Sequence, residues 1–117
     1  MANERRLIRL EVGDFLELRS LNEAGKVYKS KTKDFTLMGT CFVSEVEWKK
    51  GQVLLIDYYI PDILDSVVLK MIVIWSEFID IDKGYFCGGE ILEVEDSKEQ
   101  EFANYYFRKL KERYFNK

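Results

Sequence analysis

Apolar and polar residues alternate along most of the chain, from residue 10 to residue 94, with the period of two that is typical of strands. The pattern predicts strands over residues 10–19, 27–33, 40–48, 53–60, 67–75 and 85–94. Turn-forming residues separate these segments. Pro61 ends the fourth, because proline cannot donate a hydrogen bond to a neighbouring strand. Six short strands at this spacing predict a small, closed or nearly closed antiparallel β-barrel.

Individual segments carry further information about their place in the barrel. Segment 27–33 alternates lysines with other polar residues, which favours an edge strand, whereas segment 53–60 is apolar on both faces, as in a central strand. Residues 79–84 are expected to form a loop that ends in a hairpin turn. Gly88-Gly89 within the last segment indicates a bulge or a tight corner of the barrel.

The period changes after residue 96, where a helix is predicted over residues 97–115. Ser97 with Gln100, or Asp96 with Glu99, fits a capping box at its start. Apolar residues then recur at helical spacing, at Phe102, Ala103, Tyr106, Phe107, Leu110 and Tyr114. Since there are no repeats or linkers, we expect a single domain over 1–117, with a flexible arginine arm at 1–9, the barrel at 10–94 and the helix.

The composition disfavours most classes of enzyme and also proteins that bind nucleic acid through a large positive charge. Among 117 residues there is no histidine, which removes Ser-His and Cys-His nucleophile pairs, His-ligated zinc and heme, and the usual general base. The formal net charge is −3, from 18 Lys+Arg and 21 Asp+Glu. Residues 10–97 carry 9 positive and 17 negative side chains, a local charge of −8, between two basic ends. We therefore expect no catalysis and no binding of nucleic acid polymers.

The cysteines and the apolar segments point to the cytoplasm. Cys41 and Cys87 lack the spacing of a zinc or thioredoxin-like motif, so they are interpreted as buried thiols in a reducing compartment. The N-terminus has no signal peptide, and the longest apolar stretch, 71–75, is far shorter than a membrane span. A cytoplasmic protein with no membrane span, no metal and no cofactor is the expectation.

Two motifs flank the first two predicted strands. Arg5 and Arg9 form an Arg-x-x-x-Arg pair ahead of the first strand, and Asp34-x-Thr36-x-x-Gly39 follows the second. Each alone is more often structural: a solvated tail for the first, and an Asx-type turn with a glycine at positive φ for the second. Together they offer guanidinium groups suited to phosphate or to the edge of guanine, and a carboxylate that can accept from guanine N1–H and the 2-amino group.

These two motifs, in this order on a six-stranded barrel followed by a helix, resemble the signature of the PilZ domain family. Val73-Ile74-Trp75 and Tyr85-x-x-Gly88 resemble the family's usual core positions. The chain departs from the family pattern in having threonine at position 36, where serine is usual, and Gly89, where a branched apolar residue is common.

The resemblance implies a receptor that binds the bacterial second messenger cyclic di-GMP without turnover and signals by a change of shape. Arg5 and Arg9 would grip phosphate and guanine as the arm folds over the ligand, and Arg6 would add a contact. Asp34 and Thr36 would contact a guanine. The implied ligand-binding set is Arg5, Arg6, Arg9, Asp34, Thr36 and Gly39.

Other functions stay open at this point. The helix carries more aromatic residues than one buried stripe requires, at Phe102, Tyr105, Tyr106, Phe107, Tyr114 and Phe115. Most are expected to seal the barrel, and the rest would offer a surface for a homodimer or a downstream protein. A PilZ-like adaptor that binds no nucleotide is therefore the main alternative. A barrel for single-stranded nucleic acid is disfavoured by the acidic middle segment, and Asp57, Asp62 and Asp65 read as solvated loop residues.

Overall fold

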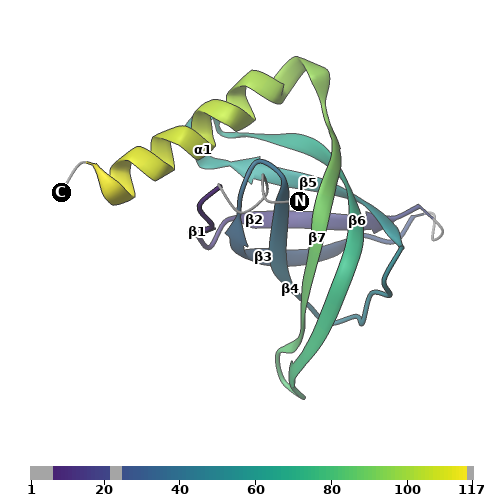
Figure 1. Cartoon of the computed structure of the whole chain (residues 1–117). Coiled ribbons are helices and arrows are strands. Elements are labelled where there is room, and N and C mark those ends of the chain that lie inside the picture. Colours follow the sequence, from purple (N-terminus) through teal and green to yellow (C-terminus); the bar gives the residue numbers. More distant parts are fainter. Residues whose placement is uncertain (1–6, 22–24, 116–117) are drawn as a thin grey trace.

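The computed structural model describes residues 7–21 and 25–115 (Figure 1). Within them the chain forms a closed, six-stranded antiparallel β-barrel with one C-terminal α-helix, as the hydrophobic pattern predicted. The elements, in order, are β1 (Leu10–Glu11), β2 (Phe15–Ser20), β3 (Tyr28–Phe35), β4 (Gly39–Ser44), β5 (Val53–Ile60), β6 (Asp65–Asp80), β7 (Gly84–Val94) and α1 (Glu99–Tyr114), with short 3-10 turns at Pro61–Ile63 and Asp96–Lys98.

The first strand of the barrel is divided into β1 and β2 by a bulge. Glu11 pairs with Asp34 and Phe15 with Lys31, so this strand advances four residues while β3 advances three. The intervening residues 12–14 stay bonded to β3 through two backbone hydrogen bonds, of 3.2 and 2.8 Å. The predicted strand over 10–19 is therefore present, with one extra residue inserted in it.

The order of the strands around the barrel is β3–β2–β5–β6–β7–β4, and β4 pairs back onto β3. The prediction of an edge strand at 27–33 holds only in part, because residues 28–31 of β3 form a ladder with β2 alone, whereas from Thr32 to Phe35 the strand is also paired with β4. Lys29, Lys31 and Lys33 are exposed and alternate with more buried residues, so the lysines form the solvent face of the strand.

Two predicted strand boundaries also need correction. β4 ends at Ser44, so the prediction of a strand as far as Trp48 is too long. Trp48 itself is buried, which explains its strand-like place in the hydrophobic pattern. β6 continues to Asp80, so the loop expected over 79–84 is reduced to a tight turn before β7, with Gly84 at φ +88°.

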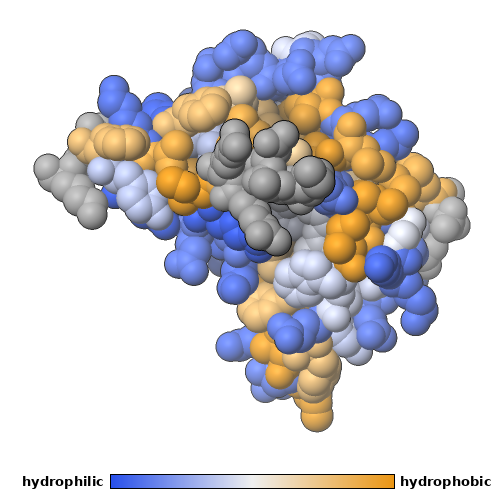
Figure 2. Space-filling view, in the orientation of Figure 1, coloured by the Kyte–Doolittle hydropathy of each residue, from blue (hydrophilic) through white to orange (hydrophobic). Residues whose placement is uncertain are grey.

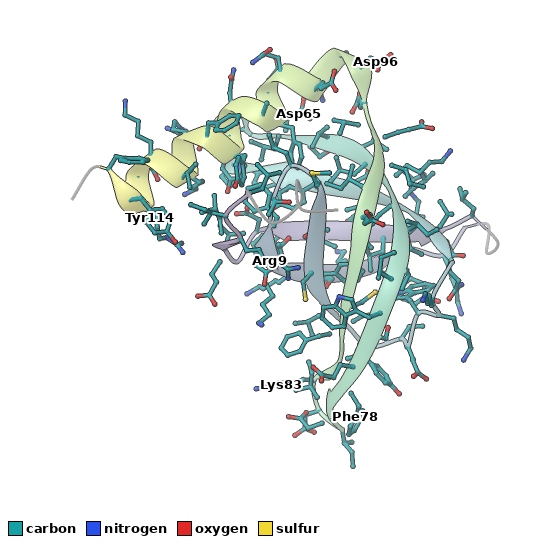
Figure 3. All side chains as sticks on the ribbon, viewed as in Figure 1. Arg9, Asp65, Phe78, Lys83, Asp96 and Tyr114 are labelled. Carbon is teal, nitrogen blue, oxygen red and sulfur yellow. The ribbon has the colours of Figure 1, made fainter. Side chains whose placement is uncertain are left out.

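The long β6–β7 hairpin projects beyond the rest of the barrel (Figure 1). Figure 3 shows Phe78 and Lys83 at its tip. Phe78 and Tyr85 pack edge to face there, with their ring centroids 5.6 Å apart. Halfway along the hairpin the register shifts between Val73 and Trp75, so the bulge predicted from Gly88-Gly89 is confirmed.

The helix α1 packs against the barrel through an aromatic cluster. Phe35 lies at its centre, with its ring 5.5 to 5.9 Å from those of Tyr58, Phe102, Tyr105 and Tyr106. Hydrogen bonds fix the same contact, because the hydroxyls of Tyr58 and Tyr105 both donate to the Asp14 carboxylate, at 2.9 and 2.6 Å. This junction joins α1, β3, β5 and the bulge of the first strand.

Two details of the helix differ from the prediction. The capping box is absent: residues 96–98 form a 3-10 turn, Lys98 takes the N-cap position without a side-chain cap, and Ser97 Oγ instead donates to Glu95 at 3.3 Å. The expectation that most of the six aromatics seal the barrel holds for half of them. Phe102, Tyr105 and Tyr106 are buried, and Phe107, Tyr114 and Phe115 are exposed.

Both cysteines are free and buried, as expected. Burial raises the pKa of Cys41 to about 11 and that of Cys87 to about 12, so both thiols are protonated near neutral pH. Across the described residues, α1 is the one α-helix, and it is too short and too polar to cross a bilayer.

Candidate functional site

A cleft of about 370 Å³ opens on the barrel wall between the β3–β4 turn and the bulged middle of the β6–β7 hairpin. Four of the residues that the sequence motifs singled out line it together: Arg9, Asp34, Thr36 and Gly39. Arg5 and Arg6 lie outside the described residues. Figure 3 shows Arg9 beside the barrel wall at the start of the first strand.

Asp34 provides a buried anionic group in the cleft. Its side chain is 12% exposed, and its Oδ1 lies 3.9 Å from Nη1 of Arg9, whose side chain is 69% exposed. Burial raises the pKa of the Asp34 carboxyl above its ordinary value, and the charges of Arg9 and Lys33 partly offset this rise. Within the described part of the chain, Arg9 is the only side-chain partner of this carboxylate, so its oxygens can accept hydrogen bonds from a ligand.

Thr36 organises the turn between β3 and β4. Its Oγ1 accepts hydrogen bonds from the backbone N–H groups of Met38, at 3.0 Å, and of Gly39, at 3.2 Å. The Thr36 N–H in turn donates to the Gly39 carbonyl at 2.8 Å. The turn is therefore closed by the threonine and not by an Asx-type contact from Asp34. Because Oγ1 accepts both bonds, the hydroxyl proton stays available to donate into the cleft.

Gly39 is required by close packing. The expected positive φ is wrong, since the described glycines with positive φ are Gly25, Gly51 and Gly84. A Cβ on Gly39 would lie 2.5 Å from the carbonyl oxygen of Gly89 on the facing strand. Glycine here lets β4 and β7 approach each other at the floor of the cleft.

The opposite wall of the cleft holds Ile74 and Trp75, which the motifs did not assign to a site. Of the expected core positions 73–75, Val73 is buried, but Ile74 and Trp75 are more than a third exposed, so the prediction is wrong for these two. The cause is the bulge in the hairpin. Val73 pairs with Gly89 and Trp75 with Gly88, which leaves Ile74 as the extra residue.

Gly88 allows the indole of Trp75 to lie directly on the strand. A Cβ at position 88 would stand 2.4 Å from Nε1 and Cε2 of that indole. An exposed indole face supported from behind is a stacking platform for a planar base. The glycine pair was the sequence signal that located this feature, although it did not reveal which side chain would occupy the space.

The fold was compared with solved structures. The PilZ domain of YcgR from Escherichia coli, solved with c-di-GMP, matches with a TM-score of 0.66 and 14% identity over 95% of this chain and 97% of that one. The chain has the PilZ fold. Bacillus subtilis MotI/DgrA, an inhibitor of motility, matches with a TM-score of 0.74 and 12% identity over 91% of this chain. MrkH from K. pneumonia, in its apo state, gives 0.55 and 14% over 92%.

The present chain spans about half of MotI/DgrA and of MrkH, 51% and 52% of their lengths, so it matches one part of each of those proteins. No family model matches the sequence, and no curated protein is similar enough to count as a relative. The PilZ fold thus emerges from the three-dimensional comparison, at identities of 12 to 14%.

Proposed function

We propose that this PilZ-like domain is a non-catalytic receptor for cyclic di-GMP, which it binds in the cleft beside the β3–β4 turn. The observation that carries the proposal is the Asp34 carboxylate. It is nearly buried in an open cleft, and its one described side-chain partner is the exposed Arg9. A carboxylate of this kind costs stability unless a ligand hydrogen-bonds to it. The match to a PilZ domain solved with c-di-GMP supports the choice of ligand.

Each side chain in the cleft has a chemical counterpart in this ligand. Asp34 accepts from guanine N1–H and the 2-amino group, and the Thr36 hydroxyl donates to the same base. The Arg9 guanidinium binds a phosphate or the guanine edge, and Arg5 and Arg6 extend this contact on the arm that precedes it. The indole of Trp75 stacks on a purine ring.

The proposal includes a route by which binding changes the surface of the protein. The end of the arginine arm and the start of the barrel are both hydrogen-bonded to α1. The Tyr106 hydroxyl donates to the Ile8 carbonyl and Arg113 Nη2 to the Glu11 carbonyl, both at 2.6 Å. Closure of the arm over a ligand would therefore displace the backbone that positions the helix. A downstream protein that binds α1 would respond to this change in the position of the helix.

Calorimetric titration of the protein with cyclic di-GMP, with GTP and cyclic AMP as controls, tests the proposal. We expect saturable binding of cyclic di-GMP alone. The double variant Arg5→Ala/Arg9→Ala should lose that binding while keeping the barrel's circular dichroism spectrum. The matched control is Arg19→Ala/Asp57→Asn, which removes an ion pair of 3.6 Å elsewhere on the barrel and should bind like the wild type.

The alternative, an adaptor that acts through protein contacts without nucleotide, is favoured by the exposed aromatics of α1. Phe107, Tyr114 and Phe115 remain outside the barrel contact. A folded wild type that shows no affinity for cyclic di-GMP would contradict the receptor and support the adaptor.

A further inference from the structure

Lys33 and Asp34 are neighbours in β3 that face the same side of the barrel wall. Between Thr32 and Asp34 the register of β3 against β4 shifts by one residue, so Lys33 is the extra residue of a bulge. In a regular strand, residues that face the same side are separated by one residue, whereas two residues separate the buried Thr32 and Phe35. Both of these intervening residues turn outward, and the bulge therefore places an exposed lysine beside the carboxylate of the cleft.

The ammonium of Lys33 lies just outside the cleft, over an aromatic ring. Its Nζ is 4.8 Å from the centroid of the Phe86 ring. Phe86 precedes Gly88 of the cleft by two residues in β7, so the two positions are about 7 Å apart on one face of the sheet. Figure 2 shows hydrophobic and hydrophilic residues side by side on the barrel wall next to the projecting hairpin. The contact of an exposed ammonium with a ring is weak, and the flexible stem of lysine lets the ammonium leave it.

The charge of Lys33 acts on the cleft and is not neutralised by the fold. In the described part of the chain, no carboxylate forms an ion pair with this ammonium. Burial raises the pKa of Asp34 and of Cys41, which both line the cleft, and the charge of Lys33 opposes the rise at each of them. An anion that enters the cleft would therefore be attracted by an ammonium group that has no acidic partner in the described residues.

We propose that Lys33 binds a phosphate of the ligand and that Lys33 and Arg9 provide cationic contacts on opposite sides of Asp34. Arg9 precedes Leu10, which pairs with Phe35, whereas Lys33 lies on the other side of Asp34 along β3. The inference rests on the proposed function, because cyclic di-GMP carries two phosphates on opposite sides of its ring. With one guanine on Asp34, the guanidinium holds one phosphate and the ammonium holds the other.

Lys31 provides a matched control on the same strand. It is exposed like Lys33, and its Nζ lies 5.1 Å from the centroid of the Phe15 ring. It belongs to the regular part of β3, where it pairs with Phe15 of β2, and it does not line the cleft. The two lysines therefore have the same charge and the same kind of ring contact, and they differ in whether the bulge places them beside Asp34.

Calorimetric titration with cyclic di-GMP compares Lys33→Met, Lys33→Arg and Lys31→Met with the wild type. Methionine removes the charge and keeps a long, flexible side chain. We expect Lys33→Met to weaken binding about tenfold, Lys33→Arg to stay within about threefold of the wild type, and Lys31→Met to bind like the wild type. The loss for Lys33→Met should shrink between about 50 mM and about 500 mM salt, because ions screen an exposed charge.

A ligand analogue identifies the group that Lys33 contacts. In this analogue a neutral formacetal bridge replaces one of the two phosphates. The remaining phosphate can bind Arg9, so the analogue should bind the wild type about tenfold more weakly than cyclic di-GMP, and Lys33→Met should weaken its binding no further. Additive losses from the analogue and the substitution would overturn a contact between Lys33 and a phosphate.

The outcomes separate this inference from the proposed function. A wild type that does not bind cyclic di-GMP rejects the receptor itself. If the wild type binds, equal affinities of Lys33→Met and Lys31→Met reject the role of Lys33 alone, as does a loss that Lys33→Arg does not restore. Urea unfolding of the three variants should give the midpoint of the wild type, since both lysines are exposed.

Discussion

Two aspartates of this barrel, Asp14 and Asp34, lie in regions built in opposite ways. The Asp14 carboxylate accepts hydrogen bonds from the Tyr58 and Tyr105 hydroxyls at the junction with the helix. The Asp34 carboxylate lies in the cleft, with a 3.9 Å ion pair to a largely exposed arginine. The Asp14 carboxylate thus accepts hydrogen bonds from within the protein, whereas the Asp34 oxygens remain able to accept hydrogen bonds from a molecule in the cleft.

The two carboxylates differ in their partners: Asp14 is hydrogen-bonded by groups of the fold, and Asp34 has only the ion pair with Arg9 among the described residues. Burial alone does not make the distinction, because both groups are shielded from water to some extent. A group whose partners belong to the fold contributes to the stability of the fold. A buried acceptor with few partners lowers the free energy of unfolding. A ligand that supplies hydrogen-bond donors to this acceptor gains binding free energy from the hydrogen bonds that the fold leaves unmade. Substitution of Asp14 should therefore lower the stability of the fold, whereas substitution of Asp34 should leave stability nearly unchanged and lower the affinity for the proposed ligand.

The largest effect on stability is expected for Asp14→Ala. It leaves the hydroxyls of Tyr58 and Tyr105 without their acceptor, and the free energy of unfolding should fall by about 3 kcal/mol. Denaturant unfolding followed by circular dichroism measures the change. Asp57→Ala, at a partly exposed ion pair, is the control and should cost less than about 0.5 kcal/mol. Equal losses at the two positions would contradict the structural role of Asp14.

An intermediate effect is expected at the glycine floor of the cleft. Gly39→Ala places a methyl group 2.5 Å from the Gly89 carbonyl oxygen, so the two strands must separate, at a cost of about 2 kcal/mol. Gly13→Ala is the matched control, since no atom lies within 4 Å of its Cβ, and it should be nearly neutral. The two midpoints of urea unfolding give the comparison directly. A neutral Gly39→Ala would mean that close packing does not explain this glycine.

A small effect on stability, combined with a large one on binding, is expected for Asp34→Asn. The unfolding free energy should stay within about 0.5 kcal/mol of the wild type, since no hydrogen bond of the described fold ends on this carboxylate. The affinity for cyclic di-GMP should fall about thirtyfold, as one charge-assisted contact is lost. Denaturant unfolding and calorimetric titration of the same preparation measure the stability and the affinity. A strongly destabilised variant would show that Asp34, like Asp14, has a structural role.

The smallest effect concerns pH. The pKa of Asp34 is raised in the folded protein, chiefly by burial, so folding favours its protonated form. The wild type should therefore gain stability relative to Asp34→Asn as the pH falls through this raised pKa, and lose it again as the pH rises. Binding follows the opposite direction, because the ligand needs the ionised carboxylate. Unfolding curves of the two proteins from neutral to mildly acidic pH test the sign.

The sequence predicted the barrel well, because alternation reports directly on which residues face inward. It was incomplete where the arrangement of the whole sheet decides the outcome. The lysines of β3 predicted an edge strand, and this holds for residues 28–31, which pair with β2 alone, but from Thr32 onward the strand also pairs with β4. Trp48 continued the alternation of β4 past its end because it is buried in a loop.

The site was predicted in part. Arg9, Asp34, Thr36 and Gly39 were expected together, and the structure brings them to one cleft. Trp75 was taken for a core residue because a large aromatic in an apolar strand is usually buried. Its exposure follows from one extra residue in β6, and a bulge changes which side of the sheet each later residue faces. The position of a bulge depends on the neighbouring strand, which local sequence does not describe.

The irregularity in β3 has a consequence for how this protein tolerates change in length. Between Thr32 and Asp34 the strand gains one residue over β4, so Thr32 and Phe35 are both buried while Asp34 lines the cleft. Loss of Lys33 would remove the extra residue and restore regular alternation, so Thr32 and Phe35 would still face inward and Asp34 would still line the cleft. A one-codon deletion at this point should therefore preserve the wall of the cleft, although the same deletion in a regular part of the strand would turn every later side chain to the other face.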